Sequence, residues 1–595
     1  MIDTLRRLAR LLDRREKFLF GLILAGSLIG ALLEMASVAA VPAFVQSLTD
    51  AERLRAHATA GPVLSRLGVE TDVDTMRVMG LALVLIVLLK TAYLITLKWA
   101  TGKYGFRRQL VISTRLFSGY LTSPYTLHLQ RNSSDLLRNV NQDAAVIVGG
   151  AIMPLLAGSM EVFTLVTILG LLVVVEPLAS VAATVVFGGT VLLFARLIQR
   201  HIERLGRRER DARARMIRAV SEGLTGIKTT RVLGREAHFL GRYAAASEEY
   251  AAAGVIRQVL DALPRLILEV VGVVGLLGLT AALIASGRTL ESLVPTLTLL
   301  AVALVRLIPS FGRLTSAHMK LGWGRAALDG VYDDLRRLGV AAPGIPQGER
   351  QPTVQEAIRL EQVTFTYPEA SGPSLVEVDM EIRRGQAVGL VGPTGSGKTT
   401  AVDVILGLLT PTEGRVSVDG VSLAGRERGW QRHVGYIPQD IFLSDTSIRQ
   451  NIAFGIAQSE IDDDAVERAL EAAQIREFVH RLPDGVTTMV GERGVRLSGG
   501  QRQRIGIARA LYHDPDVLVM DEATSALDTE TERTVMKAIE HLKGSRTLVI
   551  IAHRLSTVEA CDRLYLLRDG RVEASGSYRE LEAHSEAFQR LTARN

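Results

Sequence analysis

Gly392-Pro393-Thr394-Gly395-Ser396-Gly397-Lys398-Thr399 is the stretch that decides the fold of this 595-residue chain. It fits the pattern G-x-x-x-x-G-K-[ST], follows the apolar run 387–391 and opens a helix that includes Thr400 and continues through Val402 and Leu406. The glycines let backbone amides approach phosphate groups, Lys398 neutralises the β and γ oxygens, and the Thr399 hydroxyl ligates Mg²⁺. The strand-loop-helix context therefore predicts a phosphate-binding loop in an α/β domain.

A second element of the same chemistry follows downstream, where the apolar run Val517-Leu518-Val519-Met520 ends in Asp521-Glu522. A buried strand that ends in two acids places Asp521 beside the Mg²⁺ ion. It also places Glu522 where it can polarise an attacking water as a general base. Together with the loop, these acids predict hydrolysis of a nucleotide.

Between the two elements stands Leu497-Ser498-Gly499-Gly500-Gln501-Arg502-Gln503-Arg504, which resembles the signature of ATP-binding cassette (ABC) ATPases. Ser498, Gly499, Gly500 and Gln501 begin a helix, and the amides at a helix start form an anion site. The resemblance implies that this site receives the γ-phosphate of ATP held by a second cassette. The expected partner is therefore a second copy of the chain, and the expected cofactors are ATP and Mg²⁺.

Other matches occur in the order that the family shows. Tyr367 resembles the aromatic residue that stacks on adenine, and Gln439 resembles the residue that contacts Mg²⁺ and senses the membrane domain. Residues 491–494 resemble the loop that precedes the signature in exporters. Asp528 lies in a stretch that resembles the D-loop. His553 resembles the switch histidine, and the resemblance implies that it stabilises the γ-phosphate during catalysis.

The first half of the chain is strongly apolar. Hydrophobic residues make up 48% of the whole sequence, the mean hydropathy is +0.21, and almost all long apolar runs precede residue 313. Each of six runs reaches the length needed to cross about 30 Å of hydrocarbon. The predicted spans are 18–48, 76–97, 147–175, 177–200, 260–286 and 289–313.

Basic residues set the expected orientation. The net charge is +6, and Lys and Arg are concentrated at the amino terminus and in the segments 98–140 and 196–257, whereas 139–195 has none. By the positive-inside rule both termini, the two long loops and the ATPase domain are cytoplasmic. The same distribution explains the high pI of about 9.4 without a nucleic-acid partner.

These patterns predict a helical transmembrane domain of six spans fused to an α/β ATP-binding cassette domain. The expected divisions are an amphipathic interfacial segment 1–17, a transmembrane domain 18–336 with long cytoplasmic loops 98–146 and 201–259, a linker 337–355 and a cassette 356–595. This layout resembles the half-transporter of ABC exporters. The resemblance implies a homodimer in the bilayer of the bacterial inner membrane that couples ATP hydrolysis to transport.

Charged residues inside the predicted spans indicate the cargo, because such residues are costly in lipid unless they face protein or water. Lys90, Arg265 and Arg306 are candidates to line a cavity, where arginine can hold a phosphate or pyrophosphate group at two points. The alternative is internal pairing. Arg265 lies one helical turn from Glu269, and Lys90 has Glu34 or Glu161 as possible partners.

The runs 262–269 and 304–310, together with Lys90, resemble the bacterial lipid-linked oligosaccharide (PglK-like) flippases. This resemblance implies that the cargo is a polyprenyl-pyrophosphate glycan flipped to the outer leaflet. The alternative is an exporter of lipids, such as a lipid A-like molecule, or of hydrophobic drugs. A non-transporting ATPase is excluded by the six apolar spans, while an ATP-gated channel or regulator stays open.

Overall fold

The computed structural model divides the chain into two compact units. One comprises Met1–Thr122 and Ser133–Pro343, and the other comprises Ser123–Asn132 and Gly344–Asn595. The structure describes residues 2–49, 51–55, 60–66, 69, 71–175, 177–285, 290–338, 354–521, 533, 537, 540, 542–551 and 558–592.

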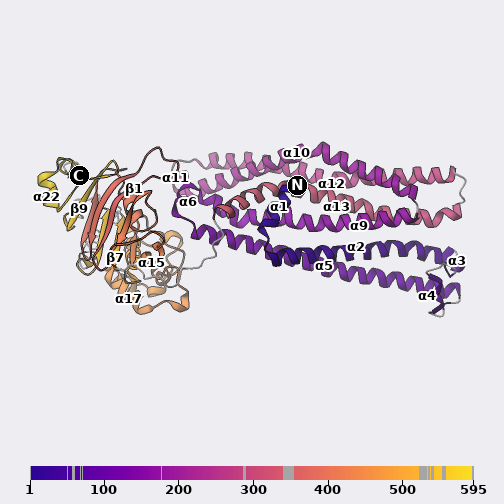
Figure 1. The fold of residues 1–595 in the computed structure, drawn as a ribbon, viewed down its shortest axis with the longest axis horizontal. Coiled ribbons are helices and arrows are strands. Elements are labelled where there is room, and N and C mark those ends of the chain that lie inside the picture. Colours follow the sequence, from indigo (N-terminus) through magenta and orange to yellow (C-terminus); the bar gives the residue numbers. More distant parts are fainter. Residues whose placement is uncertain are drawn as a thin grey trace. The chain divides into compact units, whose positions relative to one another are not determined.

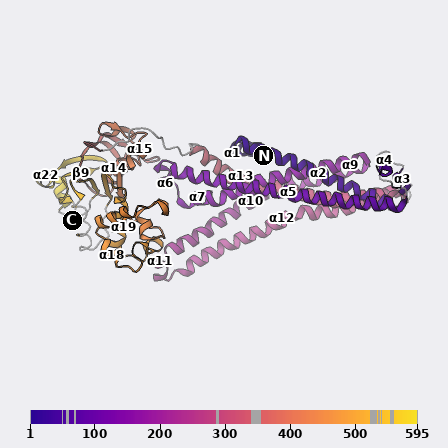
Figure 2. The same cartoon turned by 90° about the horizontal axis from the view of Figure 1, so that it is seen from below.

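The first unit is built from long helices that run side by side (Figure 1). The longest are α2 (Arg14–Thr49), α5 (Asp72–Thr122), α9 (Met153–Val175), α10 (Pro177–Thr225), α12 (Glu236–Ala285) and α13 (Leu290–Arg337). The shorter ones are α1 (Ile2–Leu11), α3 (Ala51–Arg55), α4 (Ala60–Arg66), α7 (Ser133–Arg138), α8 (Ala144–Ile147) and α11 (Ile227–Val232). Figure 2 shows α10 and α12 diverging from the other long helices toward α11.

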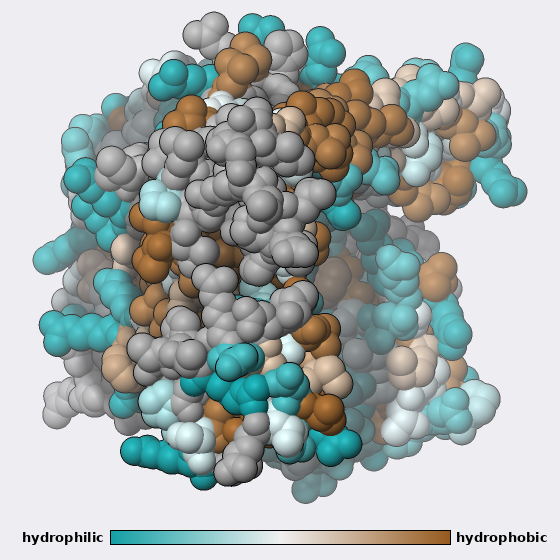
Figure 3. All heavy atoms as spheres, turned by 90° about the vertical axis from the view of Figure 1, so that its right-hand side faces the viewer, coloured by the Kyte–Doolittle hydropathy of each residue, from teal (hydrophilic) through white to brown (hydrophobic). Residues whose placement is uncertain are grey.

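Within the described residues, four helical stretches are long and apolar enough to cross a membrane: Arg14–Leu48, Asp72–Thr122, Asp135–Val174 and Leu297–Gly322. At 1.5 Å per residue, a helix of 51 residues such as α5 is about 76 Å long, more than twice the hydrocarbon thickness. Its remainder must extend into water. Figure 3 views the end of the unit that carries α3 and α4, and brown apolar side chains form patches there.

The long helices α2, α9, α12 and α13 share a core of apolar side chains. Val38, Ile168, Leu268 and Leu307, one from each of these helices, are at most 1% exposed. Since lipid tails are as apolar as these side chains, close packing rather than the hydrophobic effect stabilises such a bundle within the bilayer.

The amino-terminal helix α1 packs on the end of α13. Arg7 lies 3.2 Å from Asp329, and Arg10 donates to the Tyr332 hydroxyl at 3.1 Å. Leu8 of α1 is buried. The segment expected to lie in the membrane interface therefore also contacts the last turns of the transmembrane unit.

Two π-helical segments interrupt the helix that carries the third predicted span. They are η1 (Asn139–Asp143) and η2 (Val148–Ile152), on either side of α8. At η2 the backbone of Gly150 approaches that of Gly324 in α13 so closely that a methyl group on Gly150 would lie 2.9 Å from the Gly324 Cα atom. The absence of both side chains is what lets the two helices cross here.

The second unit contains two sheets. An antiparallel sheet has the order β2-β1-β4-β5, and a larger sheet has the order β10-β9-β3-β8-β7-β6. In the larger sheet all neighbours are parallel except β10 and β9. The strands are β1 (Ala357–Phe365), β2 (Leu375–Arg383), β3 (Ala387–Val391), β4 (Glu413–Val418), β5 (Val421–Ser422), β6 (Val434–Ile437), β7 (Val517–Asp521), β8 (Thr547–Ile551), β9 (Arg563–Arg568) and β10 (Arg571–Gly576).

Helices cover the sheets and complete the unit. They are α6 (Tyr125–Gln130), α14 (Lys398–Ile405), α15 (Glu427–Gln431), α16 (Ile448–Ile452), α17 (Asp463–Ala472), α18 (Arg476–His480), α19 (Gly499–Leu511), α22 (Tyr578–His584) and α23 (Glu586–Thr592). Strands β3, β7 and β8 are buried along their whole length, as is typical of a parallel sheet covered on both faces. The single cysteine, Cys561, lies in the apolar layer beside β3.

Candidate functional site

The phosphate-binding loop occupies the position where a parallel sheet binds ligands, at the carboxyl end of the central strand β3. Gly392, Gly395 and Gly397 all have positive φ angles, of 146°, 81° and 99°. A side chain on Gly392 would collide with the Leu567 carbonyl oxygen, which lies 2.2 Å from the Cβ position. The glycines therefore permit both the turn and its close packing on β9.

Lys398 begins α14 and folds back over its own loop. Its ammonium group donates to the Gly392 carbonyl at 2.8 Å and to the Pro393 carbonyl at 3.0 Å, and the side chain is buried. The positive charge is thereby held over the start of the helix, where the backbone amides and the helix dipole also favour an anion.

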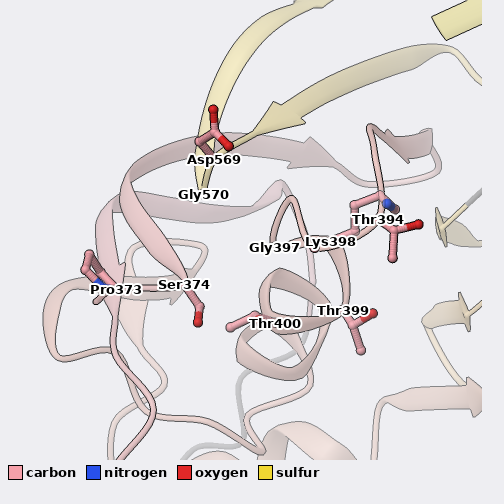
Figure 4. Close-up of a pocket in the computed structure, with 10 residues that line it drawn as sticks. Pro373, Ser374, Thr394, Gly397, Lys398, Thr399, Thr400, Asp569 and Gly570 are labelled. Carbon is pink, nitrogen blue, oxygen red and sulfur yellow. The ribbon is translucent and has the colours of Figure 1, made fainter. Parts of the chain in front are cut away.

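The loop borders a cavity of about 560 Å³ (Figure 4). The loop and α14 residues that line it were predicted from the sequence, whereas Pro373, Ser374, Asp569 and Gly570 on the opposite side were not. Gly570 has a φ of 77° and ends the Asp-Gly turn between β9 and β10. The Asp-Gly dipeptide predicts a turn from the sequence alone, but only the order of the strands in the sheet places that turn beside the phosphate-binding loop. The described lining residues are Pro373, Ser374, Thr394, Gly395, Gly397, Lys398, Thr399, Thr400, Asp569 and Gly570.

Tyr367 is brought to the same neighbourhood. Its hydroxyl lies 3.1 Å from the Thr400 hydroxyl, and its ring packs edge-on against Phe365 at 4.9 Å between centroids. The aromatic residue expected at adenine thus lies beside the first turn of α14.

Two carboxylates near the loop interact electrostatically. Asp521 ends β7, and Asp403 is buried on α14. Burial and the negative charge of Asp521 raise the pKa of Asp403 to about 6. Mutual repulsion of this kind creates a demand for a cation, and carboxylates with a hydroxyl such as that of Thr399 are the oxygen ligands that Mg²⁺ prefers. These residues therefore fit a magnesium ion.

Gln439 lies at the same edge of the sheet. It follows β6, which runs parallel to β7 with Ile437 opposite Met520. Since parallel strands end at a common edge, the chain just after β6 and the end of β7 are neighbours. The contact of Gln439 with Mg²⁺ beside Asp521 stays a prediction.

The signature forms the start of α19. Ser498 caps the helix: its hydroxyl accepts from the Gln501 amide at 3.3 Å, while the Gln501 side chain accepts from the Ser498 amide at 2.8 Å. This capping box leaves the amides of Gly499 and Gly500 available at an exposed helix start. Ser498 is not among the described residues that line the phosphate cavity.

The other end of α19 is tied to the segment that follows Gln439. The Arg509 side chain donates to the Phe442 carbonyl at 2.7 Å and to the Asn451 carbonyl at 2.8 Å. Asn451 is fully buried. These hydrogen bonds connect the chain after Gln439 to the signature helix.

The short helix α6, which follows the end of α5, belongs to the second unit. Burial, followed by the charge of Asp403 and the neighbouring Tyr367, raises the pKa of Tyr125 at its start. The start of α6 therefore lies near the carboxylate pair. The proposed base Glu522, the D-loop Asp528 and the switch His553 lie outside the described residues.

The three candidate cargo residues do not form one group. Lys90 and Arg306 both contact Glu34, at 3.3 Å and 2.7 Å, whereas Arg265 contacts Glu269 at 2.9 Å. Of the two partners expected for Lys90, Glu34 and Glu161, the structure therefore confirms Glu34. The other, Glu161, contacts Arg313 instead. Arg313 was not predicted from the sequence, because only the packing of the helices brings it to Glu161.

Two family models match the chain. The model described as ABC transporter transmembrane region matches residues 28–307, and the model described as ABC transporter matches residues 375–525. A solved structure of a bacterial Atm1-family ABC exporter with ATP bound has a TM-score of 0.79 and 24% sequence identity. The match covers 96% of this chain and 98% of the chain of that exporter. That likeness shows the fold.

Curated relatives are closer in sequence. The ATP-dependent lipid A-core flippase of Nitrosococcus oceani is 31% identical over 90% of this chain and 89% of its own length. The protein of the same name from Ralstonia nicotianae is 33% identical over 79% of this chain and 79% of its own length. The one from Cupriavidus pinatubonensis is 37% identical over 65% of this chain and 65% of its own length.

Proposed function

Because the chain belongs to the ABC transporter family, as a membrane-spanning half-transporter of the exporter type, we propose that it flips a lipid A-core molecule, or a closely related phosphorylated glycolipid, across the bacterial inner membrane. The observation that carries this proposal is the 31% identity over 90% of the chain to a protein named lipid A-core flippase. The polyprenyl-pyrophosphate glycan expected first from the sequence has less support than the lipid A-like alternative.

The working form is a homodimer with both termini and both cassettes in the cytoplasm. Lys398 and the loop amides bind the phosphates of ATP on one copy, and the signature start at the partner subunit's Ser498 closes over the γ-phosphate. Thr399, Gln439 and Asp521 would hold Mg²⁺, which screens the phosphate charge. Glu522 polarises the attacking water, while His553 stabilises the γ-phosphate.

Closure of the cassettes is the step that moves the membrane helices. ATP binds the closed pair more tightly than the open pair, so it shifts the equilibrium toward closure. The position of Tyr125 near Asp403, and the Arg509 link between α19 and the chain after Gln439, support transmission through α6 and the signature helix. Hydrolysis then removes the γ-phosphate contacts and resets the pair.

The test is ATP-dependent flipping of labelled lipid A-core in proteoliposomes, compared with the Glu522→Gln variant. We expect flipping that requires ATP, and loss of both flipping and hydrolysis in the variant, which should still bind ATP. Normal hydrolysis by the variant would contradict the assigned base. Flipping of a polyprenyl-pyrophosphate glycan but not of lipid A-core would contradict the proposed cargo.

A further inference from the structure

Tyr120, Asn139 and Asp334 form a buried hydrogen-bonded triangle near the ends of α5 and α13. The Tyr120 hydroxyl donates to Asp334 Oδ2 at 2.6 Å. The Asn139 side-chain amide donates to the same oxygen at 2.9 Å and to the Tyr120 hydroxyl at 3.1 Å. The three residues are 4%, 7% and 5% exposed. Each side chain therefore bonds to both of the others, and such a buried network fixes the relative positions of its members.

The triangle lies beside the places where the chain passes between the two units. The chain leaves the first unit after α5 and again after α13, and it returns to that unit at α7. Tyr120 is in the last turn of α5, and Asp334 is in the last turn of α13. Asn139 begins η1, which follows α7 directly. The three side chains therefore tie together the helix ends next to all of these crossings.

The π-helical form of η1 places Asn139 on the packed face of its helix. The Ala144 amide donates to the Asn139 carbonyl, five residues back in the chain, where an ordinary α-helix would bond four residues back. One turn therefore contains an extra residue, so Asn139 and Ala144 lie on the same face, and both are buried. Segments of this kind are rare and occur frequently at functional sites.

Two other contacts near these helix ends differ from the triangle. Ser113 of α5 donates to the Val140 carbonyl of η1 at 2.8 Å, a bond that does not involve α13. Arg7 of α1 lies 3.2 Å from Asp329 of α13, but the two side chains are 31% and 38% exposed, and solvent weakens such pairs. The triangle, in contrast, is buried and joins α5, η1 and α13 at once.

We propose that Tyr120, Asn139 and Asp334 are positioning residues that make the ends of α5 and α13 move as one body when the cassettes close. Hydrogen-bond networks between packed helices can carry such a coupling. Without the triangle, α5 still leads into α6 and follows the second unit, while α13 no longer moves with α5. Hydrolysis then continues but drives less transport. That the transported molecule is a lipid rests on the proposed function.

The first test is Tyr120→Phe, which removes the shared hydroxyl and keeps the ring. Hydrolysis of ATP and flipping of lipid A-core are measured on the full-length protein in the same proteoliposomes. We expect hydrolysis within about twofold of the unmodified protein and flipping per ATP about tenfold lower, because buried hydrogen-bonding groups lose their partners. The matched control is Ser113→Ala, which removes a hydroxyl between α5 and η1 and should leave both rates within about twofold.

The second test exchanges the two groups that Tyr120 contacts. Asn139→Asp places a second carboxylate against Asp334, whereas Asn139→Asp combined with Asp334→Asn again gives one carboxylate and one amide. The Tyr120 hydroxyl can donate to the carboxylate and accept from the amide in either arrangement. We expect flipping per ATP to fall about tenfold in the single variant and to return to within about threefold in the double variant. If the double variant does not recover, or if Tyr120→Phe lowers hydrolysis and flipping equally, the triangle is only structural and the inference is overturned.

A readout that needs no cargo keeps the two proposals separate. Hydrogen exchange of residues 113–122 and 328–337 is measured with and without ATP and vanadate. In the unmodified protein we expect both segments to change together, and in Tyr120→Phe we expect the response of 328–337 to fall about fivefold while that of 113–122 remains. This result without flipping of lipid A-core would overturn the proposed transport and leave the triangle standing. Flipping of lipid A-core with segments that respond independently in the unmodified protein would overturn the triangle and leave the transport standing.

Discussion

Asp403 is a buried carboxylate on the first helix after the phosphate loop, and the charge of Asp521 contributes to its raised pKa. Nothing in its sequence neighbourhood distinguishes it, because the feature arises only when β7 and α14 pack together. The loop residues differ in this respect. Their spacing is local, so the sequence predicts Lys398 and Thr399 directly, whereas Asp403 needs the fold.

The raised pKa of Asp403 predicts a pH-dependent cost to folding. The pKa of Asp403 in the folded protein, about 6, exceeds its ordinary value of 3.8. The free-energy cost of holding the ionised carboxylate in the fold is therefore absent below about pH 4, grows as the pH rises through 6 and then stays constant. Asp403→Asn removes it. We expect the variant to be more stable at pH 7.5 by up to about 3 kcal/mol, measured by unfolding without nucleotide or Mg²⁺.

A control for Asp403→Asn is the same substitution at an exposed aspartate. Asp440→Asn, at an exposed position of the same unit, should change stability by about 0.5 kcal/mol or less at every pH. A stabilisation by Asp403→Asn that is equal at pH 4.5 and pH 7.5 would show that ionisation is not its cause.

At the scale of elements, the strand-loop-helix of β3 and α14 could be predicted because its glycines, lysine and apolar residues are adjacent in the chain. The π-helical segments η1 and η2 could not. Pro154, two residues after η2, does not distinguish a π-helical segment from an ordinary helix, and the close approach of η2 to α13 involves residues far apart in the sequence. Similarly, the pairing of Arg313 with Glu161 depends on which faces α9 and α13 present to each other.

The crossing of η2 and α13 predicts opposite effects for adjacent glycines. Gly150→Ala should destabilise the membrane unit by about 1–3 kcal/mol, because the new methyl group would lie 2.9 Å from the Gly324 Cα atom. Gly149→Ala should be neutral or stabilising, because a methyl group there would meet no atom within 4 Å and alanine favours helix. Thermal unfolding in detergent measures both, and equal effects would contradict the crossing.

At the scale of the whole molecule, the phosphate cavity and the signature are expected to meet only between two copies. Lys398→Ala and Ser498→Ala should each abolish hydrolysis in a homodimer. When the two variants are expressed together, mixed dimers regain one intact site, formed by unmodified Lys398 of one copy and unmodified Ser498 of the other. Hydrolysis should therefore recover in purified mixed dimers. No recovery would mean that each site lies within one chain.

Cys561 has a practical consequence for following such motions. It is the only cysteine of the chain and is 7% exposed, and burial raises the pKa of its thiol to about 12. Because the thiolate is the reactive form, this residue should resist maleimide and nitroxide reagents at neutral pH. Spin labels or fluorophores can then be attached to introduced cysteines without first removing a native one, so distances can be recorded on the otherwise unaltered transporter.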